Sequence, residues 1–186
     1  MKNAKTALNL TEGKPMKLIL LFAIPVFLGN LFQICYSLVD TKIVGRILGE
    51  TALAAVGSVS VLYTLLTGFF NGLSLGFSVL TARYYGSGEE RKLKENVAGA
   101  ILLGFLTATV LIAGIAMFIR PILTLLNVPP QQIDMALSYI TLLVWGMFIT
   151  LAYNLCANTL RAIGDSITPL IFLVIAAVTN VALDYL

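Results

Sequence analysis

Long apolar stretches separated by short polar segments dominate this sequence of 186 residues. A membrane-spanning helix needs about 20 apolar residues to cross roughly 30 Å of hydrocarbon, and five stretches are long enough to be candidates. The pattern therefore predicts an all-α integral membrane protein with an N-terminal cytoplasmic tail over residues 1–16. The five predicted transmembrane helices cover about residues 17–47, 51–85, 93–119, 132–162 and 169–186.

Proline and glycine refine this prediction within the first two spans. Pro25 lacks a backbone donor and should kink the first helix. The second span has one side without side chains, because glycine recurs every fourth residue at Gly68, Gly72 and Gly76. That spacing favours close packing against another helix, with a bend at Gly72 as the alternative.

The predicted connections carry recognisable turn signals. Arg120-Pro121 and the run 127–130, which ends in two prolines, are expected to connect the third and fourth spans. Asp165 or Ser166 is placed to cap the fifth helix, and Pro169 falls in its first turn.

Composition supports a membrane protein and excludes several other classes. The chain is 59% hydrophobic and 11% charged, with a mean hydropathy of +0.94, whereas soluble domains have roughly 25% charged residues. There is no histidine, and Cys35 and Cys156 lie within apolar segments, so neither a disulfide framework nor a cysteine–histidine metal site is expected. The scattered basic residues form no nucleic-acid patch. No nucleophile–base pair or metal motif indicates an enzyme.

The distribution of lysine and arginine predicts the orientation of the chain. Nine of the twelve basic residues lie in the N-terminal tail, in the connections after the second and fourth spans, or at the span ends beside them. Lys42, Arg46 and Arg120 fall on the other side. By the positive-inside rule, the N-terminus is cytoplasmic in a multi-pass protein of the cell membrane.

Two aspartates lie near the far ends of apolar spans, where a charged carboxylate is costly and normally functional. Asp40 follows Pro25 by 15 residues, and Asp184 follows Pro169 by the same interval, which is about 22 Å of helix rise. Both carboxylates should therefore lie in the outer half of the membrane. They can reach one another if the two helices are neighbours.

Polar residues also recur at helical spacing, so that each set shares one face of its helix. These sets are Asn30, Gln33, Ser37 and Asp40 in the first span, Asn154, Asn158, Arg161 and Asp165 in the fourth, and Asn180 with Asp184 in the fifth. Such faces can line a polar cavity, or they can form interhelical hydrogen bonds in a solid bundle. For the two aspartates, the ionisable group favours a functional role.

Several segments together carry a family resemblance, namely 11–15, 24–25, 28–30, 40–46, 52–57, 161–165 and 180–184. They resemble the multidrug and toxic compound extrusion (MATE) family, most closely its prokaryotic branch of DNA-damage-inducible-like transporters. The resemblance implies a fold of twelve transmembrane helices in two six-helix lobes. It also implies alternating access, in which inward movement of H⁺ or Na⁺ drives export of small amphipathic, often cationic drugs.

The resemblance assigns roles to individual positions. Asp40, Asn180 and Asp184 match the coupling-cation site, which binds H⁺ or holds Na⁺, and Pro25 matches the position at which the first helix bends. Candidates for lining the substrate cavity are Gln33, Tyr36, Tyr139 and Asn154. No cofactor beyond the coupling ion is expected.

The sequence departs from the family pattern in length. It corresponds to most of the first lobe, so we expect it to be an incomplete part of a transporter that works with the missing C-terminal helices or lobe. Two alternatives are a flippase for lipid-linked sugars with a related fold, and a membrane scaffold or remnant that does not transport.

Overall fold

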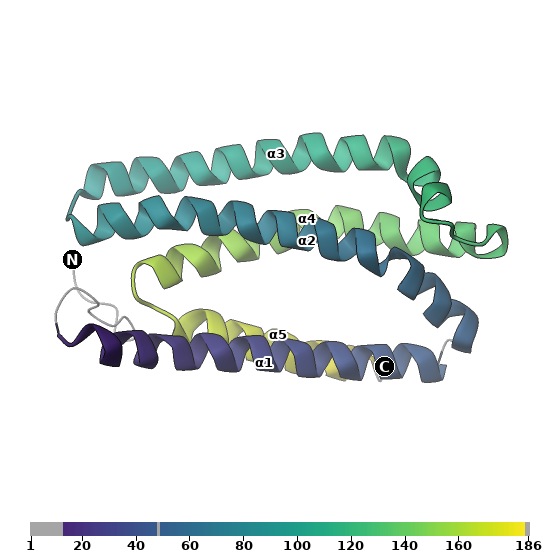
Figure 1. Ribbon diagram of the computed structural model, residues 1–186, viewed down its shortest axis with the longest axis horizontal. Coiled ribbons are helices and arrows are strands. Elements are labelled where there is room, and N and C mark those ends of the chain that lie inside the picture. Colours follow the sequence, from purple (N-terminus) through teal and green to yellow (C-terminus); the bar gives the residue numbers. More distant parts are fainter. Residues whose placement is uncertain (1–12, 48, 185–186) are drawn as a thin grey trace.

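The computed structural model describes residues 13–47 and 49–184, without the side chains of Tyr36, Asp40, residues 44–47 and 49–55, and Asp184. Long helices make up most of the described chain (Figure 1). They are α1 (Pro15–Ile47), α2 (Gly49–Gly86), α3 (Glu90–Leu125), the short 3₁₀ helix η1 (Pro130–Gln132), α4 (Ile133–Ala162) and α5 (Ile167–Asp184).

Within the described residues, four segments are long and apolar enough to cross a membrane, namely Pro15–Ile43, Val56–Gly86, Glu90–Leu125 and Pro130–Ala162. The apolar part of α5 is shorter and covers Ile167–Leu183. The structure differs from the sequence prediction at the end of α3, which continues through Pro121 to Leu125, whereas the proline is predicted to begin the connection. The helix instead changes direction in its last turns (Figure 1), because proline can kink a helix without ending it.

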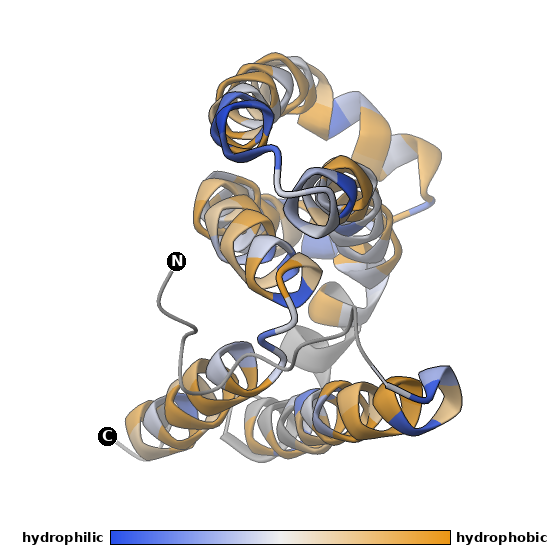
Figure 2. Ribbon diagram, turned by 90° about the vertical axis from the view of Figure 1, so that its left-hand side faces the viewer, coloured by the Kyte–Doolittle hydropathy of each residue, from blue (hydrophilic) through white to orange (hydrophobic). Residues whose placement is uncertain are grey.

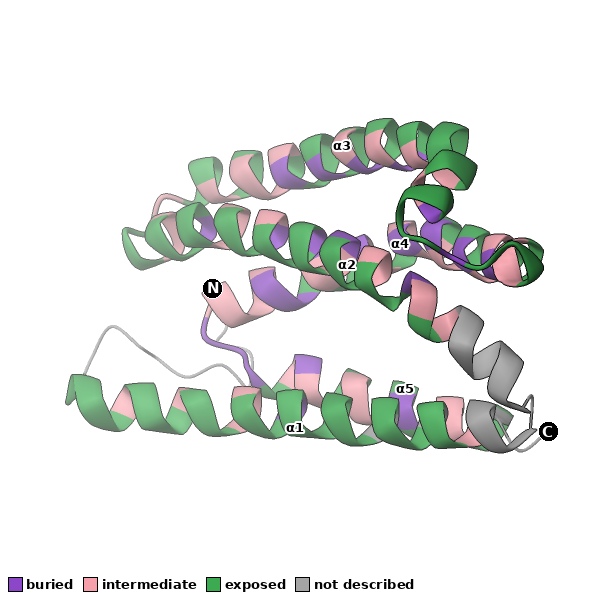
Figure 3. Ribbon diagram, turned by 45° about the vertical axis from the view of Figure 1, so that its right-hand side comes forward, coloured by how far each residue is buried: buried purple, intermediate pink, exposed green. Residues whose placement is uncertain are grey.

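The helices form two groups. α2, α3 and α4 pack together, whereas α1 and α5 lie side by side and run in the same direction (Figure 1). The buried core belongs mainly to the first group, and its largest fully buried side chains include Phe70, Leu123, Ile140, Met147 and Leu151. Among the described residues of α1, Gly29 alone is buried, and most of that helix is exposed (Figure 3).

Apolar side chains cover the outside of both groups. Met117, Leu142 and Ile149 are each more than 70% exposed. Figure 2 shows hydrophobic residues along the helices and several of the most hydrophilic segments at their ends. This is the reverse of a soluble protein, and it is expected where lipid rather than water surrounds the helices.

The helix ends are tightly defined by one recurring motif. At the end of α2, Gly88 N–H bonds to Tyr85 O at 3.2 Å and Glu89 N–H bonds to Tyr84 O at 3.0 Å. This pair of bonds is a Schellman motif, which requires a left-handed residue after the helix. Gly88 has φ +73°, and α3 ends in the same way at Asn127, with φ +56°. Backbone hydrogen bonds and a left-handed residue therefore define the conformation of each of these two turns.

The packing predicted for the glycine stripe of α2 is wrong within the described structure. Nothing described lies within 4 Å of a Cβ atom built on Gly68, Gly72 or Gly76. α2 instead buries Phe70 and Ser74. Because neighbouring residues are rotated by about 100° around a helix, Gly72, two positions from each, lies on the opposite side.

Candidate functional site

The polar stripe of α1 borders an open hollow of about 370 Å³. Asn30, Gln33 and Ser37 line this hollow together with Ile34 and Leu38. All five side chains are exposed, so contacts within the described chain leave the polar stripe accessible.

Asp40 continues this stripe by one further helical step. It and Tyr36 lie in α1, and Asp184 is the last residue of α5, but the side chains of all three lie outside the described residues. Their positions are therefore known at the level of the helix backbone.

Asn180 presents an unsatisfied acceptor on α5. Its Oδ1 atom is buried and has no hydrogen-bond partner among the described residues. The side chain borders a hollow of about 280 Å³, which Leu173, Ala176 and Ala177 also line. A buried acceptor without a donor costs about 1–3 kcal/mol, so this atom is suited to a cation or to a donor from outside the described structure.

The register of α1 against α5 gives the two aspartates a common level. A Cβ atom built on Gly29 would lie 3.6 Å from Leu170 Cδ1 and 3.6 Å from Leu173 Cδ2. Asp40 follows Gly29 by eleven residues, and Asp184 follows Leu173 by eleven residues, which is about 16 Å of rise on each helix. Because the helices are parallel neighbours, these backbone positions lie at similar heights.

The two cavity candidates on α4 lie in the other helix group. Tyr139 is half-buried and packs against the core of α2, α3 and α4. Asn154 is half-buried on α4, four turns further along. Gln33 lies on α1 in the other helix group, so the three candidates come from both groups.

The cytoplasm-facing end predicted for α4 contains a buried polar cluster. Asn158 and Ser166 are 4% and 2% exposed, and Arg161 Nη1 donates to Asn158 Oδ1 at 3.3 Å. Asn158 Nδ2, Arg161 Nε and Ser166 Oγ lack partners among the described residues. Asp165, which the sequence placed on the same polar stripe, accepts hydrogen bonds from the start of α5.

Two contacts between helices are not predicted by the sequence. Asn96 Nδ2 of α3 donates to Thr81 Oγ1 of α2 at 2.9 Å. Tyr153 Oη of α4 donates to Pro169 O of α5 at 3.4 Å, which is a long hydrogen bond. Asn96 follows a charged segment and Tyr153 precedes a polar stripe, but neither pattern identifies a partner on another helix.

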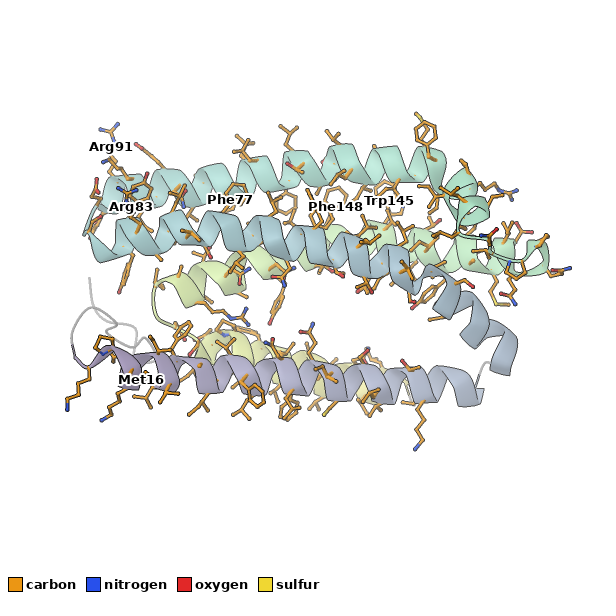
Figure 4. The ribbon with its side chains drawn as sticks, in the orientation of Figure 1. Met16, Phe77, Arg83, Arg91, Trp145 and Phe148 are labelled. Carbon is orange, nitrogen blue, oxygen red and sulfur yellow. The ribbon has the colours of Figure 1, made fainter. Side chains whose placement is uncertain are left out.

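The basic segments lie at one end of the molecule. The start of α1, the α2–α3 turn and the α4–α5 turn share this end (Figure 1), and Arg83 and Arg91 lie at the α2–α3 turn (Figure 4). In this turn, the Lys92 ammonium forms an ion pair with the Glu89 carboxylate. This contact lowers the pKa of Glu89, with a further hydrogen bond from Ser87, and raises the pKa of Lys92.

Comparison with known proteins places this arrangement in a family. The MatE family model matches residues 25–186. The chain belongs to the MatE family. It is 36% identical over 163 residues to the probable multidrug resistance protein YoeA of Bacillus subtilis, a match that covers 88% of this chain and 35% of that protein. YpnP, a second probable multidrug resistance protein of Bacillus subtilis, is 30% identical over 179 residues, covering 95% of this chain and 40% of YpnP.

Solved MATE structures have the same fold. Crystal structures of MATE in the bent and straight conformations are 25% and 26% identical to this chain, with TM-scores of 0.88 and 0.85. Each match covers 98% of this chain and 40% of the solved chain. This MatE chain is thus a multi-pass, all-α membrane protein that spans less than half the length of these relatives.

Pro25 lies within α1, which is one helix from Pro15 to Ile47. Figure 1 shows no break in α1, so the kink expected at Pro25 is not pronounced in this conformation. The proline nevertheless removes one backbone hydrogen bond from the helix, because it has no N–H to donate to Leu21 O. In this MatE chain it lies one turn before Gly29, where α1 meets α5.

Proposed function

We propose that this chain is the cation-responsive part of a multidrug exporter. In this proposal, inward movement of H⁺ or Na⁺ drives export of amphipathic, often cationic compounds by alternating access. The names of the relatives YoeA and YpnP, both probable multidrug resistance proteins, support the export of drugs. The family and the absence of a nucleophile–base motif favour transport over catalysis.

The observation that carries the proposal is the common level of Asp40 and Asp184 on neighbouring parallel helices. Asn180 lies one turn before Asp184 and has a buried oxygen without a donor among the described residues. Two carboxylates and an amide oxygen form a set of hard ligands that is suited to a small cation. The same carboxylates can exchange a proton, because two like charges close together disfavour full ionisation of both.

The proposed coupling follows from neutralisation of this pair. A bound proton or Na⁺ removes the cost of holding two charges inside the membrane. α1 can then bend at Pro25, where one helical hydrogen bond is already missing. The cation shifts the population between two packings of α1 against α5, provided that it binds one of them more tightly.

The substrate is proposed to contact polar and aromatic side chains. Gln33 lies in the α1 hollow, and Tyr36, Tyr139 and Asn154 are the further candidates on α1 and α4. A second substrate class is worth testing, because one relative is named as a FAD transporter of Shewanella oneidensis. It is 26% identical over 168 residues, covering 90% of this chain and 37% of that protein.

We further propose that the N-terminus faces the cytoplasm of a cell membrane. This end holds most of the basic residues, as the positive-inside rule requires. Because the solved MATE chains are more than twice as long, the chain is proposed to act together with the helices that complete such a transporter.

The test is gradient-driven efflux of a cationic dye from proteoliposomes that contain the intact transporter. Under an imposed H⁺ or Na⁺ gradient, Asp40→Asn and Asp184→Asn should each reduce the efflux rate by at least about tenfold. A tenfold loss corresponds to about 1.4 kcal/mol. Asp134→Asn is the matched control, because Asp134 is an exposed aspartate paired with Arg120 at the start of α4. Normal coupled efflux in both test variants would overturn the proposal.

A further inference from the structure

The two helix groups are joined in two places, where α1 leads into α2 and at the α4–α5 turn. α5 packs along α1, and α4 packs with α2 and α3, while α4 and α5 have little contact with each other. Figure 1 shows α4 and α5 meeting at this turn. The turn is the direct covalent link from α5 to the other group, so its stiffness affects how far a movement of α5 reaches α4.

The turn is built from two adjacent motifs. One ends α4 and the next begins α5, with no residue between them. Gly164 has φ +92°, and its N–H bonds to Arg161 O at 3.0 Å while Asp165 N–H bonds to Leu160 O at 2.9 Å. These bonds end α4 in a Schellman motif. The very next residue, Asp165, caps α5.

Asp165 holds the first turn of α5 through three hydrogen bonds. Its Oδ1 atom accepts from Ile167 N at 3.2 Å and from Thr168 N at 2.9 Å. Its Oδ2 atom accepts from Thr168 Oγ1 at 2.6 Å. Asp165 is 3% exposed, so water cannot readily replace these bonds. Beyond the turn, Tyr153 Oη reaches Pro169 O and braces α4 against α5.

We propose that Asp165 is a positioning residue that locks α5 to α4. Asn180 lies thirteen residues after Ile167, which is about 20 Å along α5. A tilt of α5 at that end would be absorbed by a loose turn. A stiff turn passes it to α4, because coupling travels through rigid packed elements. This inference rests on the function proposed above, in which a cation bound between α1 and α5 changes how these two helices pack.

The first experiment measures stiffness without transport. Spin labels are placed at Ile149 of α4 and Ile175 of α5, which are 77% and 55% exposed, in a protein without its native cysteines. Wild type should give one narrow distance distribution. Asp165→Ala should broaden it at least twofold, and Asp165→Asn should restore it, because asparagine also caps helices. An equally narrow distribution in Asp165→Ala would overturn the proposal.

The second experiment measures ethidium binding in detergent and gradient-driven ethidium efflux from proteoliposomes, with the intact transporter. Asp165→Ala should keep the dissociation constant within about twofold and lower efflux at least tenfold. Gly164→Ala should behave alike, because its φ is left-handed. Gly88→Ala is the matched control. It strains the same motif at the α2–α3 turn, which lies within one helix group, so it should keep efflux within threefold of wild type.

Three further outcomes would overturn the positioning role of Asp165 or the proposed function. If Gly88→Ala and Gly164→Ala reduce efflux by the same factor, the loss reflects general strain and the positioning role is wrong. The role is equally wrong if Asp165→Ala broadens the distances but leaves efflux unchanged. A wild-type transporter that shows no gradient-driven efflux of any tested substrate overturns the proposed function and this inference together, whereas the other contrary results overturn this inference alone.

Discussion

Gly29 of α1 lies against Leu173 of α5, where a Cβ atom built on the glycine would be 3.6 Å from Leu173 Cδ2. This contact sets the register of two parallel helices. Gly29 is also buried on a helix that is otherwise mostly exposed. The alignment of Asp40 with Asp184 therefore depends on how closely α1 approaches α5 at this point.

Substitutions at Gly29 should distinguish the effect of side-chain size on the α1–α5 contact from the effect of glycine on helix stability. Gly29→Ala adds one carbon at ordinary contact distance and should stabilise the protein by about 0.5–1 kcal/mol, because glycine is a poor helix former. Gly29→Phe should force the helices apart and destabilise by about 1–3 kcal/mol, as overpacking does. Thermal unfolding in detergent checks both values.

Gly72 provides the control for this pair, because nothing described lies within 4 Å of a Cβ atom built on it. Gly72→Phe should change the melting temperature much less than Gly29→Phe. Equal losses at the two positions would show that the α1–α5 contact is not close.

The sequence predicts well what hydropathy and local capping control. Five apolar stretches give the five long helices, and Asp165, one of the two predicted capping residues, caps α5. These features depend on residues close together in the chain.

The contacts that depend on helix pairing are less visible in the sequence. The Asn96–Thr81 bond and the Tyr153–Pro169 bond join separate helices, and no local spacing specifies them. The glycine stripe has no packing partner among the described residues, because a helix face without side chains does not identify its neighbour. The coupling-cation assignment of Asp40 and Asp184 stays a prediction.

Buried hydroxyl groups with and without partners should respond differently to removal. Ser166 Oγ is buried and lacks a partner among the described residues, so Ser166→Ala should leave stability unchanged or raise it by up to about 1 kcal/mol. Thr81 Oγ1 accepts from Asn96, so Thr81→Val should destabilise by about 1–2 kcal/mol. Melting temperatures of the two variants in one detergent provide the comparison, and a larger loss for Ser166→Ala would reveal a partner for its hydroxyl.

The exposed Glu89–Lys92 pair should give a defined pH window. Because the folded pKa of Glu89 is lowered and that of Lys92 is raised, the stabilisation is fully present between about pH 4.3 and 10.4, the usual unfolded values. It is lost as pH falls through the lowered pKa of Glu89 or rises through the raised pKa of Lys92. The difference in melting temperature between wild type and Lys92→Ala should therefore be small and constant inside this window and shrink outside it. High salt should weaken it, because exposed ion pairs are screened. A difference that changes between pH 6 and 8 would point to another titrating group.

Cysteine labelling tests the proposed orientation at two turns that lie at opposite ends of the molecule. Ser87 is exposed in the α2–α3 turn and Gln131 is exposed between α3 and α4. Cys35 and Cys156 are free and exposed, so both are first replaced by serine. If the basic end faces the cytoplasm, a membrane-impermeant maleimide added to intact cells should label Gln131→Cys at least tenfold more than Ser87→Cys. Permeabilised cells should label both, which controls for reactivity. The reverse pattern in intact cells would place the N-terminus outside and would put both aspartates in the cytoplasmic half of the membrane.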